Sequence, residues 1–290
     1  MNGIIVLNKP AGRTSFEAVR AVSRLFSREK AGHAGTLDPM ATGVLPVFLG
    51  RATKLLPFLP VTEKEYIASI SFGVKTDTGD LEGNILEQSE GRPSEEAWEQ
   101  AIKKHVGAQF QIPPMYSAIK KDGKPLYELA RKGQVIDREP REITVYELKT
   151  LSFDGDTAKI RVLCSAGTYV RTLAEDLALE CGCLAHLTDL KRTRACGFSL
   201  EESVTLEQIE GSEDREGFLI TPESLFEGYP SVELDSNLAR LFLNGFLFPI
   251  SRTGRSLEQG KRVTVFYGGR LIGLGEITYK EELKKLWQTE

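Results

Sequence analysis

One acidic residue, Asp38, stands in a run of mostly small residues, GHAGTLDPMATG, residues 32–43. Gly32 and Gly35 allow backbone angles that are closed to other residues, so the chain can bend sharply and approach a ligand. Pro39 restricts Asp38 to extended conformations and so predicts a stiff turn. A carboxylate held in this way can act as a nucleophile that forms covalent intermediates. Aspartate before proline is also an ordinary turn residue, but a flanking histidine, paired glycines and a threonine favour a site of chemistry.

Six motifs, taken in order, resemble those of the TruB-type tRNA pseudouridine synthases. Residues 32–43 resemble the catalytic loop of that family, and the other five matches are NGIIVLNKPAGRTS (2–15), KEY (64–66), GVKTDT (73–78), PPMYSA (113–118) and GTYVRT (167–172). The resemblance is strong over residues 2–210 and weak beyond them. It implies an enzyme that isomerises uridine-55 in the TΨC loop of tRNA to pseudouridine, with the TΨC stem-loop of tRNA as its partner.

The implied reaction needs neither a redox step nor an external group. The N1–C1′ bond breaks, the base rotates while it is held, and C5 bonds to C1′. The stacked uracil must first be flipped out of the RNA, at a cost of roughly a few kcal/mol. The resemblance makes Asp38 the candidate nucleophile, and attack on C1′ and deprotonation of the sugar both stay open. A glycosidase would need a second carboxylate at a defined distance, and no second acid stands out beside Asp38 in the motifs.

Two further residues are expected beside Asp38. The family's active-site arginine maps onto Arg171, and a guanidinium within hydrogen-bonding reach would keep a buried carboxylate ionised. A surface salt bridge at a strand end or helix start is the alternative for Arg171. Tyr66 is the candidate platform for the base, because stacking of a base on an aromatic ring contributes ~1–3 kcal/mol. A tyrosine on an alternating strand can equally belong to the core.

The remaining candidates are one catalytic and three substrate-binding residues. Tyr169 lies two residues before Arg171, and in an extended segment the two side chains would share a face. We therefore expect the Tyr169 hydroxyl to reach both the uracil and the ion pair, and to help remove the C5 proton. The resemblance suggests that His33 contacts the RNA and holds the opened loop, that Leu190 lines the uracil pocket, and that Lys9 lies near the catalytic loop. Leu190 and Lys9 fit a core or scaffold role equally well.

Charge is segregated along the chain. The net charge is −4, which argues weakly against a nucleic-acid partner. Residues 1–60, however, hold eight basic and three acidic side chains, whereas residues 201–230 hold one basic and nine acidic ones. Affinity for phosphates depends on the local face rather than on the total, so the N-terminal region favours RNA binding.

Several protein classes are disfavoured by what the sequence lacks. The four cysteines, Cys164, Cys181, Cys183 and Cys196, do not form two Cys-x-x-Cys units, so neither a structural zinc site nor any other metal is expected. No phosphate-binding loop, dinucleotide fingerprint or His-Glu-x-x-His motif is present, and we expect no small-molecule cofactor. No apolar run approaches the ~18 residues of a membrane span. A cytoplasmic monomer without membrane contact is the expectation.

Around these residues the pattern predicts an α+β fold, with a mixed, mostly antiparallel sheet and flanking helices. A capping box at Thr14 and Glu17 begins a helix with Phe16, Val19, Val22 and Phe26 on its apolar face, and Arg20, Arg24 and Arg28 form a basic ridge. Strands are expected at residues 4–7, 43–49, 65–72, 144–153, 157–164 and 190–198, and helices at 94–106, 124–132 and 170–181. The acidic stretch 201–227 is expected to wrap or link.

We expect two domains: a catalytic domain over residues 1–229 and a small PUA-like, RNA-binding β-barrel over residues 230–290, with a short helix at 236–243. Two other functions stay open. An RNA-binding adaptor or tRNA-folding factor would remodel RNA without chemistry, and would keep its function when Asp38 is replaced by asparagine. A carboxylate-based nucleoside hydrolase would release free uracil, which an isomerase must not do.

Overall fold

The N-terminal segment builds one edge of a large sheet in the computed structural model, which describes residues 2–121 and 123–289. Strand β1 (Gly3–Lys9) pairs antiparallel with β3 (Thr42–Leu49) in a register that places Lys9 opposite Gly43. Between them lie helix α1 (Ser15–Leu25) and the short strand β2 (Ala31–His33), which pairs with β3 on its other side. The Asp38 loop therefore connects two neighbouring strands.

Nine strands of the described residues form this sheet, in the order β1-β3-β12-β4-β11-β10-β7, with β2 on β3 and β13 on β12. All pairings are antiparallel except that of β12 with β3. The predicted mixed, mostly antiparallel sheet is thus confirmed. The bounds are Lys64–Phe72 (β4), Gly107–Gln111 (β7), Arg141–Phe153 (β10), Thr157–Cys164 (β11), Ala185–Ala195 (β12) and Phe198–Ser199 (β13).

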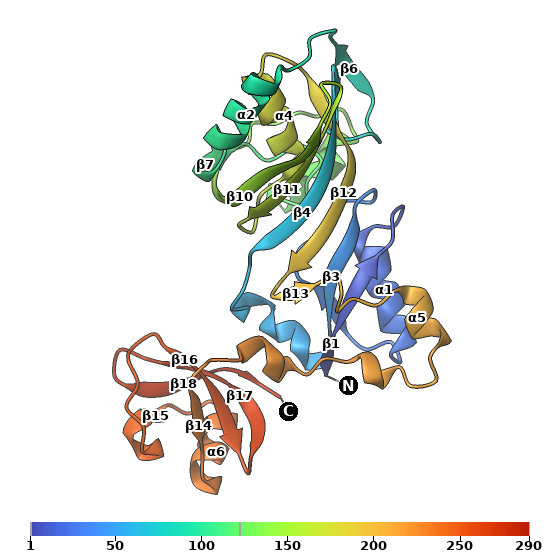
Figure 1. The fold of residues 1–290 in the computed structure, drawn as a ribbon. Coiled ribbons are helices and arrows are strands. Elements are labelled where there is room, and N and C mark those ends of the chain that lie inside the picture. Colours follow the sequence, from blue (N-terminus) through green and yellow to red (C-terminus); the bar gives the residue numbers. More distant parts are fainter. Residues whose placement is uncertain (1, 122, 290) are drawn as a thin grey trace.

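Two helices pack together on one face of this sheet, α2 (Glu95–Lys104) and α4 (Val170–Glu180) (Figure 1). Trp98 of α2 is fully buried, and its ring stacks on Phe153 with 5.8 Å between centroids. The β4 side chains at positions 66, 68, 70 and 72 are buried while the intervening ones are half-buried, as their alternation predicts. This core fixes the face of β4 that carries Tyr66.

The C-terminal segment forms a separate five-stranded sheet in the order β14-β16-β17-β18-β15 (lower part of Figure 1). Its elements are β14 (Ser231–Glu233), α6 (Ser236–Leu243), β15 (Phe248–Pro249), β16 (Arg262–Tyr267), β17 (Arg270–Ile277) and β18 (Glu282–Gln288). A small, β-rich module with one helix is the architecture expected for a PUA-like domain. It packs on the larger part through Trp287, which shares an apolar cluster with Phe48 and donates to the Arg51 carbonyl.

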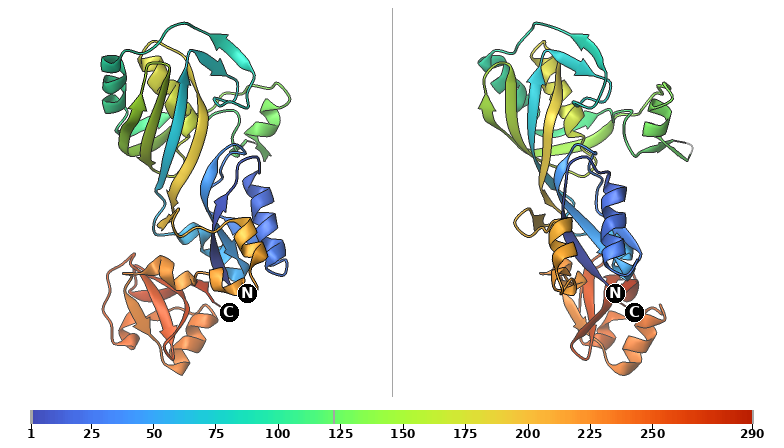
Figure 2. Two further views of the ribbon diagram at one scale, coloured as in Figure 1. Left: turned by 45° about the vertical axis from the view of Figure 1, so that its right-hand side comes forward. Right: turned by 90° about the vertical axis from the view of Figure 1, so that its right-hand side faces the viewer.

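One short helix, α3, stands away from the main body and is drawn in green in Figure 2. The shorter elements, α3 included, connect the layers. They are η1 (Gly50–Phe58), β5 (Val74–Thr76), β6 (Ile85–Gln88), β8 (Lys120–Lys121), β9 (Lys124–Pro125), α3 (Leu126–Ala130), α5 (Leu206–Gly211), η2 (Glu216–Phe218), η3 (Pro222–Phe226) and η4 (Ile250–Thr253). Residues 204 and 220 of the acidic stretch bridge to β1, so this stretch wraps along the sheet edge. No helix within the described ranges is long and apolar enough to cross a membrane.

Several predicted details are wrong. Phe16 lies on the exposed face of α1, with 66% of its surface accessible, rather than on the apolar stripe. Helix α1 ends at Leu25 because Ser27 and Arg28 both adopt positive φ, so Arg28 does not continue the basic ridge. The predicted helices at residues 94–106 and 124–132 are shorter, because His105 caps the first and Pro125 precedes the second.

Candidate functional site

The Asp38 loop is supported from beneath by a buried ammonium group. Lys9 is fully buried, and its Nζ donates to the carbonyl oxygens of Pro10 (2.8 Å), Arg13 (2.6 Å) and Pro39 (3.2 Å). Burial lowers the pKa of Lys9 to about 8. The geometry does not favour the predicted role of Lys9 in substrate binding. Its ammonium group donates to three main-chain oxygens, and Lys9 lines neither of the two cavities that contain Asp38.

A second buried cation anchors the start of the loop. Arg192 on β12 is fully buried and donates to the carbonyl oxygens of Val44 (2.7 Å), Gly35 (2.9 Å) and Thr36 (3.3 Å). Its own backbone approaches Gly43 so closely that a Cβ there would lie 2.1 Å from the Arg192 carbonyl oxygen. Glycine at position 43 therefore permits the parallel contact between β3 and β12.

The Asp38 carboxylate faces a guanidinium that is fixed on all sides. Arg171 in the first turn of α4 donates from Nε to Asp38 Oδ2 (2.9 Å) and from Nη2 to Asp38 Oδ1 (3.1 Å). Its remaining contacts are the carbonyl oxygens of Thr78 (2.6 Å) and Tyr116 (2.8 Å). The Arg171 side chain is 4% exposed and that of Asp38 is 31% exposed. Of the two charged groups, the carboxylate is therefore the one that solvent or a ligand can reach. Such bidentate pairs fix orientation as well as charge.

A second acid, Asp80, which lies outside the sequence motifs, shares this guanidinium. Its Oδ2 lies 3.7 Å from Arg171 Nε, and its side chain is 5% exposed. The Thr78 hydroxyl donates to Asp80 Oδ1 at 2.6 Å. Glu82, on the same loop, lines a cavity that also contains Asp38 and Asp80. Burial, and then the Asp80 carboxylate, raise the pKa of Glu82. The sequence offered one signal for Asp80: it lies two residues after the end of the 73–78 motif.

Asp38, Arg171 and Lys64 are the charged residues of a pocket of about 180 Å³ whose other walls are uncharged. Tyr66 of β4 and Leu190 of β12 line it, and both are nearly buried. They come from adjacent strands, because Leu190 pairs with Ala68 across the β12–β4 ladder. The pocket thus combines an ion pair with an aromatic ring and an aliphatic side chain.

Tyr169 lines the same pocket, but not for the reason predicted. It is the extended N-cap residue of α4, and Arg171 already lies in the helix, so the two do not share the face of an extended segment. Gln111, which the sequence did not single out, holds the Tyr169 backbone by accepting from its N–H (2.8 Å) and donating to its C=O (3.1 Å). Burial raises the pKa of Tyr169, so its hydroxyl stays protonated at neutral pH.

A wider cleft of about 610 Å³ adjoins this pocket and shares Asp38 and Arg171 with it. His33, at the end of β2, lines the wider cleft and not the pocket. Burial lowers the pKa of His33, and the nearby Arg192 cation lowers it further, so the imidazole is neutral at pH 7. Helices α1 and α3 contribute Phe16 and Tyr127 to its walls.

Two family models match the chain, and their boundary falls within this site. Residues 23–170 match the TruB family pseudouridylate synthase N-terminal domain, and residues 171–220 match the tRNA pseudouridylate synthase B C-terminal domain. This chain belongs to the TruB family of pseudouridylate synthases. The boundary separates Asp38 from Arg171, so the ion pair joins the two matched segments.

Curated relatives of this TruB-family chain cover nearly its full length. The tRNA pseudouridine synthase B of Aromatoleum aromaticum is 44% identical over 95% of this chain and 89% of its own. That of Stutzerimonas stutzeri is 42% identical over 96% of this chain and 92% of its own. Its similarity to these relatives places the chain in an enzyme family that forms pseudouridine.

Solved structures show the same fold. A Cbf5-Nop10-Gar1 complex contains a chain that is 29% identical, with a TM-score of 0.70 over 95% of this chain and 78% of that chain. An H/ACA RNP bound to a substrate RNA containing 2′-deoxyuridine contains one that is 26% identical, with a TM-score of 0.68 over 99% of this chain and 84% of that chain.

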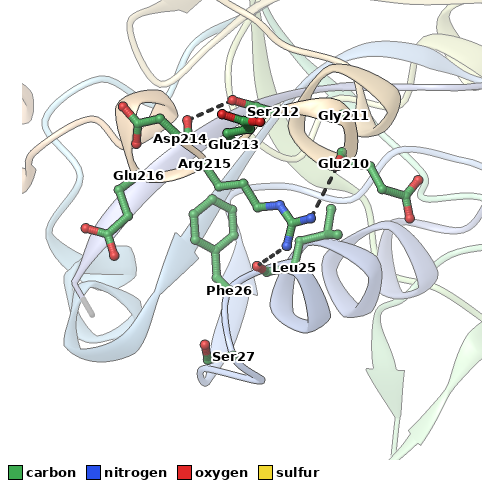
Figure 3. Close-up of a pocket in the computed structure, with 10 residues that line it drawn as sticks. All are labelled: Leu25, Phe26, Ser27, Glu210, Gly211, Ser212, Glu213, Asp214, Arg215 and Glu216. Carbon is green, nitrogen blue, oxygen red and sulfur yellow. Dashed lines mark hydrogen bonds between the residues drawn. The ribbon is translucent and has the colours of Figure 1, made fainter.

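Another hollow lies elsewhere, between the end of α1 and the loop after α5 (Figure 3). Arg215 spans it, donating to the carbonyl oxygens of Leu25 and Glu210. Four acidic residues line it, Glu210, Glu213, Asp214 and Glu216. An acidic surface repels phosphate groups, so we expect no RNA contact at this hollow of the TruB-family chain. No group of three or more His, Cys, Asp or Glu side chains in residues 2–121 and 123–289 is arranged to hold a metal ion.

Proposed function

We propose that this chain isomerises uridine-55 in the TΨC loop of tRNA to pseudouridine, acting as a cytoplasmic monomer. One observation carries the proposal: a bidentate Arg171–Asp38 pair lies in a uracil-scale pocket walled by Tyr66 and Leu190. The names of the curated relatives support tRNA as the substrate. The choice of the TΨC loop rests on the family resemblance.

Asp38 is the proposed nucleophile. Arg171 donates two N–H groups to the two carboxylate oxygens and two more to main-chain carbonyls, so the carboxylate is held in one orientation before the RNA arrives. Preorganised groups of this kind need no rearrangement during the reaction. Attack on C1′ and deprotonation of the sugar both begin from this ionised carboxylate.

The detached uracil must stay in place while it rotates. Tyr66 offers a ring for stacking, which is worth ~1–3 kcal/mol per base, and Leu190 closes the same pocket. Because both side chains are nearly buried in the sheet, their positions do not depend on the RNA. We propose that they retain the base between cleavage and rebonding.

His33 is the proposed contact to the opened RNA loop. It lines the wider cleft rather than the uracil pocket. With the flipped uridine in the pocket, the neighbouring nucleotides of the loop would lie in this cleft. Since its imidazole is neutral at pH 7, it would stack or accept a hydrogen bond rather than carry charge.

Tyr169 is the proposed relay for the C5 proton. We expect Tyr169→Phe to slow pseudouridine formation about 100-fold, the lower end for loss of a general acid–base group, with tRNA binding unchanged. The raised pKa of Tyr169 fits a hydroxyl that passes a proton on rather than a stored phenolate. Single-turnover assays would measure the effect, and unchanged turnover would remove this role.

Asp80 is proposed to position Arg171. In Asp80→Asn, the guanidinium keeps Asp38 but loses the second anion 3.7 Å away. We expect kcat to fall about tenfold with KM unchanged, which corresponds to a loss of ~1.4 kcal/mol of transition-state stabilisation. Asp77→Asn is the matched control, because Asp77 lies on the same loop but contacts Asn84 instead. Equal activity of both variants would show that Asp80 has no such role.

The decisive experiment for the whole proposal is incubation of the protein with unmodified tRNA, followed by mapping of pseudouridine. We expect modification at position 55 and no free uracil. Release of uracil would instead identify a hydrolase. Tight binding without any modified base would identify an RNA-remodelling adaptor.

A further inference from the structure

Phe16 is a large aromatic side chain exposed beside the catalytic cleft. It is 66% exposed, although its spacing predicts a place in the core. Its position is fixed, because the Thr14–Glu17 capping box sets the start of α1 and Phe16 is the second residue of the helix. The ring lines the wider cleft that also contains Asp38 and His33. An exposed ring at this place has no packing role to explain it.

Arg20, one turn along the same helix, covers part of the Phe16 ring. Its guanidinium carbon lies 5.7 Å from the ring centroid, within the range of a cation–π contact. A guanidinium over one face of the ring leaves the other face available. Aromatic rings next to arginines are the usual platform for unpaired bases, because every base has a π-face and every nucleotide a phosphate.

A basic groove of about 370 Å³ lies on this helix, lined by Gly12, Arg13, Glu17, Arg20, Ala21 and Arg24. It contains three arginines and one acid. The Glu17 carboxylate is occupied, because it accepts from the N–H and the hydroxyl of Thr14. Because three arginines outnumber one carboxylate, the groove is cationic, and Arg20 is the residue that links it to Phe16 and so to the cleft.

We propose that Phe16 stacks an unpaired base adjacent to the flipped uridine, while Arg20, with Arg13 and Arg24, binds phosphates of the same RNA strand. This inference rests on the proposed function and adds a second contact to it. Because phenylalanine has no hydrogen-bonding group, the contact would tolerate any base. It would hold the opened loop against α1 while the target base occupies the pocket lined by Tyr66.

The first test measures the KM and kcat of Phe16→Ala, Phe16→Trp and Phe110→Ala on an unmodified TΨC stem-loop. Phe110 is the matched control, since it is 74% exposed on β7, at the opposite edge of the large sheet from β1. We expect KM to rise about tenfold in Phe16→Ala, with kcat changed less, and Phe16→Trp to restore KM. A KM for Phe16→Ala equal to that of Phe110→Ala would overturn the proposal.

The second test locates the base by placing a single abasic nucleotide at each loop position beside the target. The wild-type protein should lose affinity when one particular loop position is abasic. The affinity of Phe16→Ala, which already lacks the ring, should not fall further when that same position is abasic. Arg20→Ala should lower the slope of log K against log salt by about 0.7 to 1, whereas Lys103→Ala on α2 should leave it unchanged. Equal losses in Phe16→Ala and wild type at every abasic position would exclude stacking on Phe16.

These tests separate the two proposals. If the wild-type protein forms no pseudouridine, the proposed function fails whatever Phe16 does. If it forms pseudouridine and the Phe16 and Arg20 variants behave like their controls, only this inference fails.

Discussion

An Asp38→Asn variant should bind unmodified tRNA as tightly as the wild-type protein and form pseudouridine about 10⁴-fold more slowly or not at all, as expected when a nucleophile is removed. Asparagine has the shape of aspartate and can still accept a hydrogen bond from Arg171, which contacts both oxygens of Asp38. It has no charge and cannot attack carbon. Single-turnover assays with excess enzyme, together with filter binding, would measure the two quantities separately.

The same variant separates an enzyme from an adaptor. Its thermal unfolding should be compared with that of the wild type, so that a loss of fold is not taken for a loss of chemistry. Retained turnover in a folded Asp38→Asn protein would mean that no reaction step depends on this carboxylate. It would then favour a protein that only remodels RNA.

Replacing Arg171 with lysine should lower kcat about 100-fold while tRNA binding changes little. An ammonium group keeps the charge but cannot form the two parallel hydrogen bonds to Asp38 and also reach the carbonyl oxygens of Thr78 and Tyr116. Breaking a buried ion pair costs about 3–5 kcal/mol, and we expect part of that loss here because the charge is retained. Steady-state kinetics and denaturant unfolding would measure the effects.

Arg161→Lys is the matched control for this substitution. Arg161 on β11 pairs with Glu147 and Glu65 and is 37% exposed, so its replacement should change activity less than twofold, as for most exposed pairs. If Arg171→Lys and Arg161→Lys were equally active, the bidentate geometry at Asp38 would not matter for turnover.

Much of the fold follows from local sequence patterns. The alternating side chains of β4, the capping box of α1 and the strands β10 and β11 were all predicted, because each depends on residues that are close in sequence. Several short strands were not predicted, among them β14 and β15. These are three and two residues long, too short for a period to be visible.

The site was harder to predict where it depends on distance in sequence. Asp38 and Arg171 are 133 residues apart, and only the family motifs linked them. Asp80 and Gln111 were missed, because a buried polar residue is recognised only when its partner is known. Phe16 was misplaced, since helical spacing alone cannot tell a ring that faces the core from one at the edge of the apolar stripe.

The anchoring of the catalytic loop has a consequence for how the protein tolerates change. Within this loop, Lys9 and Arg192 bind the main-chain oxygens of Gly35, Thr36 and Pro39, and every residue type supplies such an oxygen. Substitutions within the loop therefore leave its scaffold intact unless they alter backbone angles. The shape of the loop thus depends on two cations outside it, and the Asp38 carboxylate is left for its contact with Arg171.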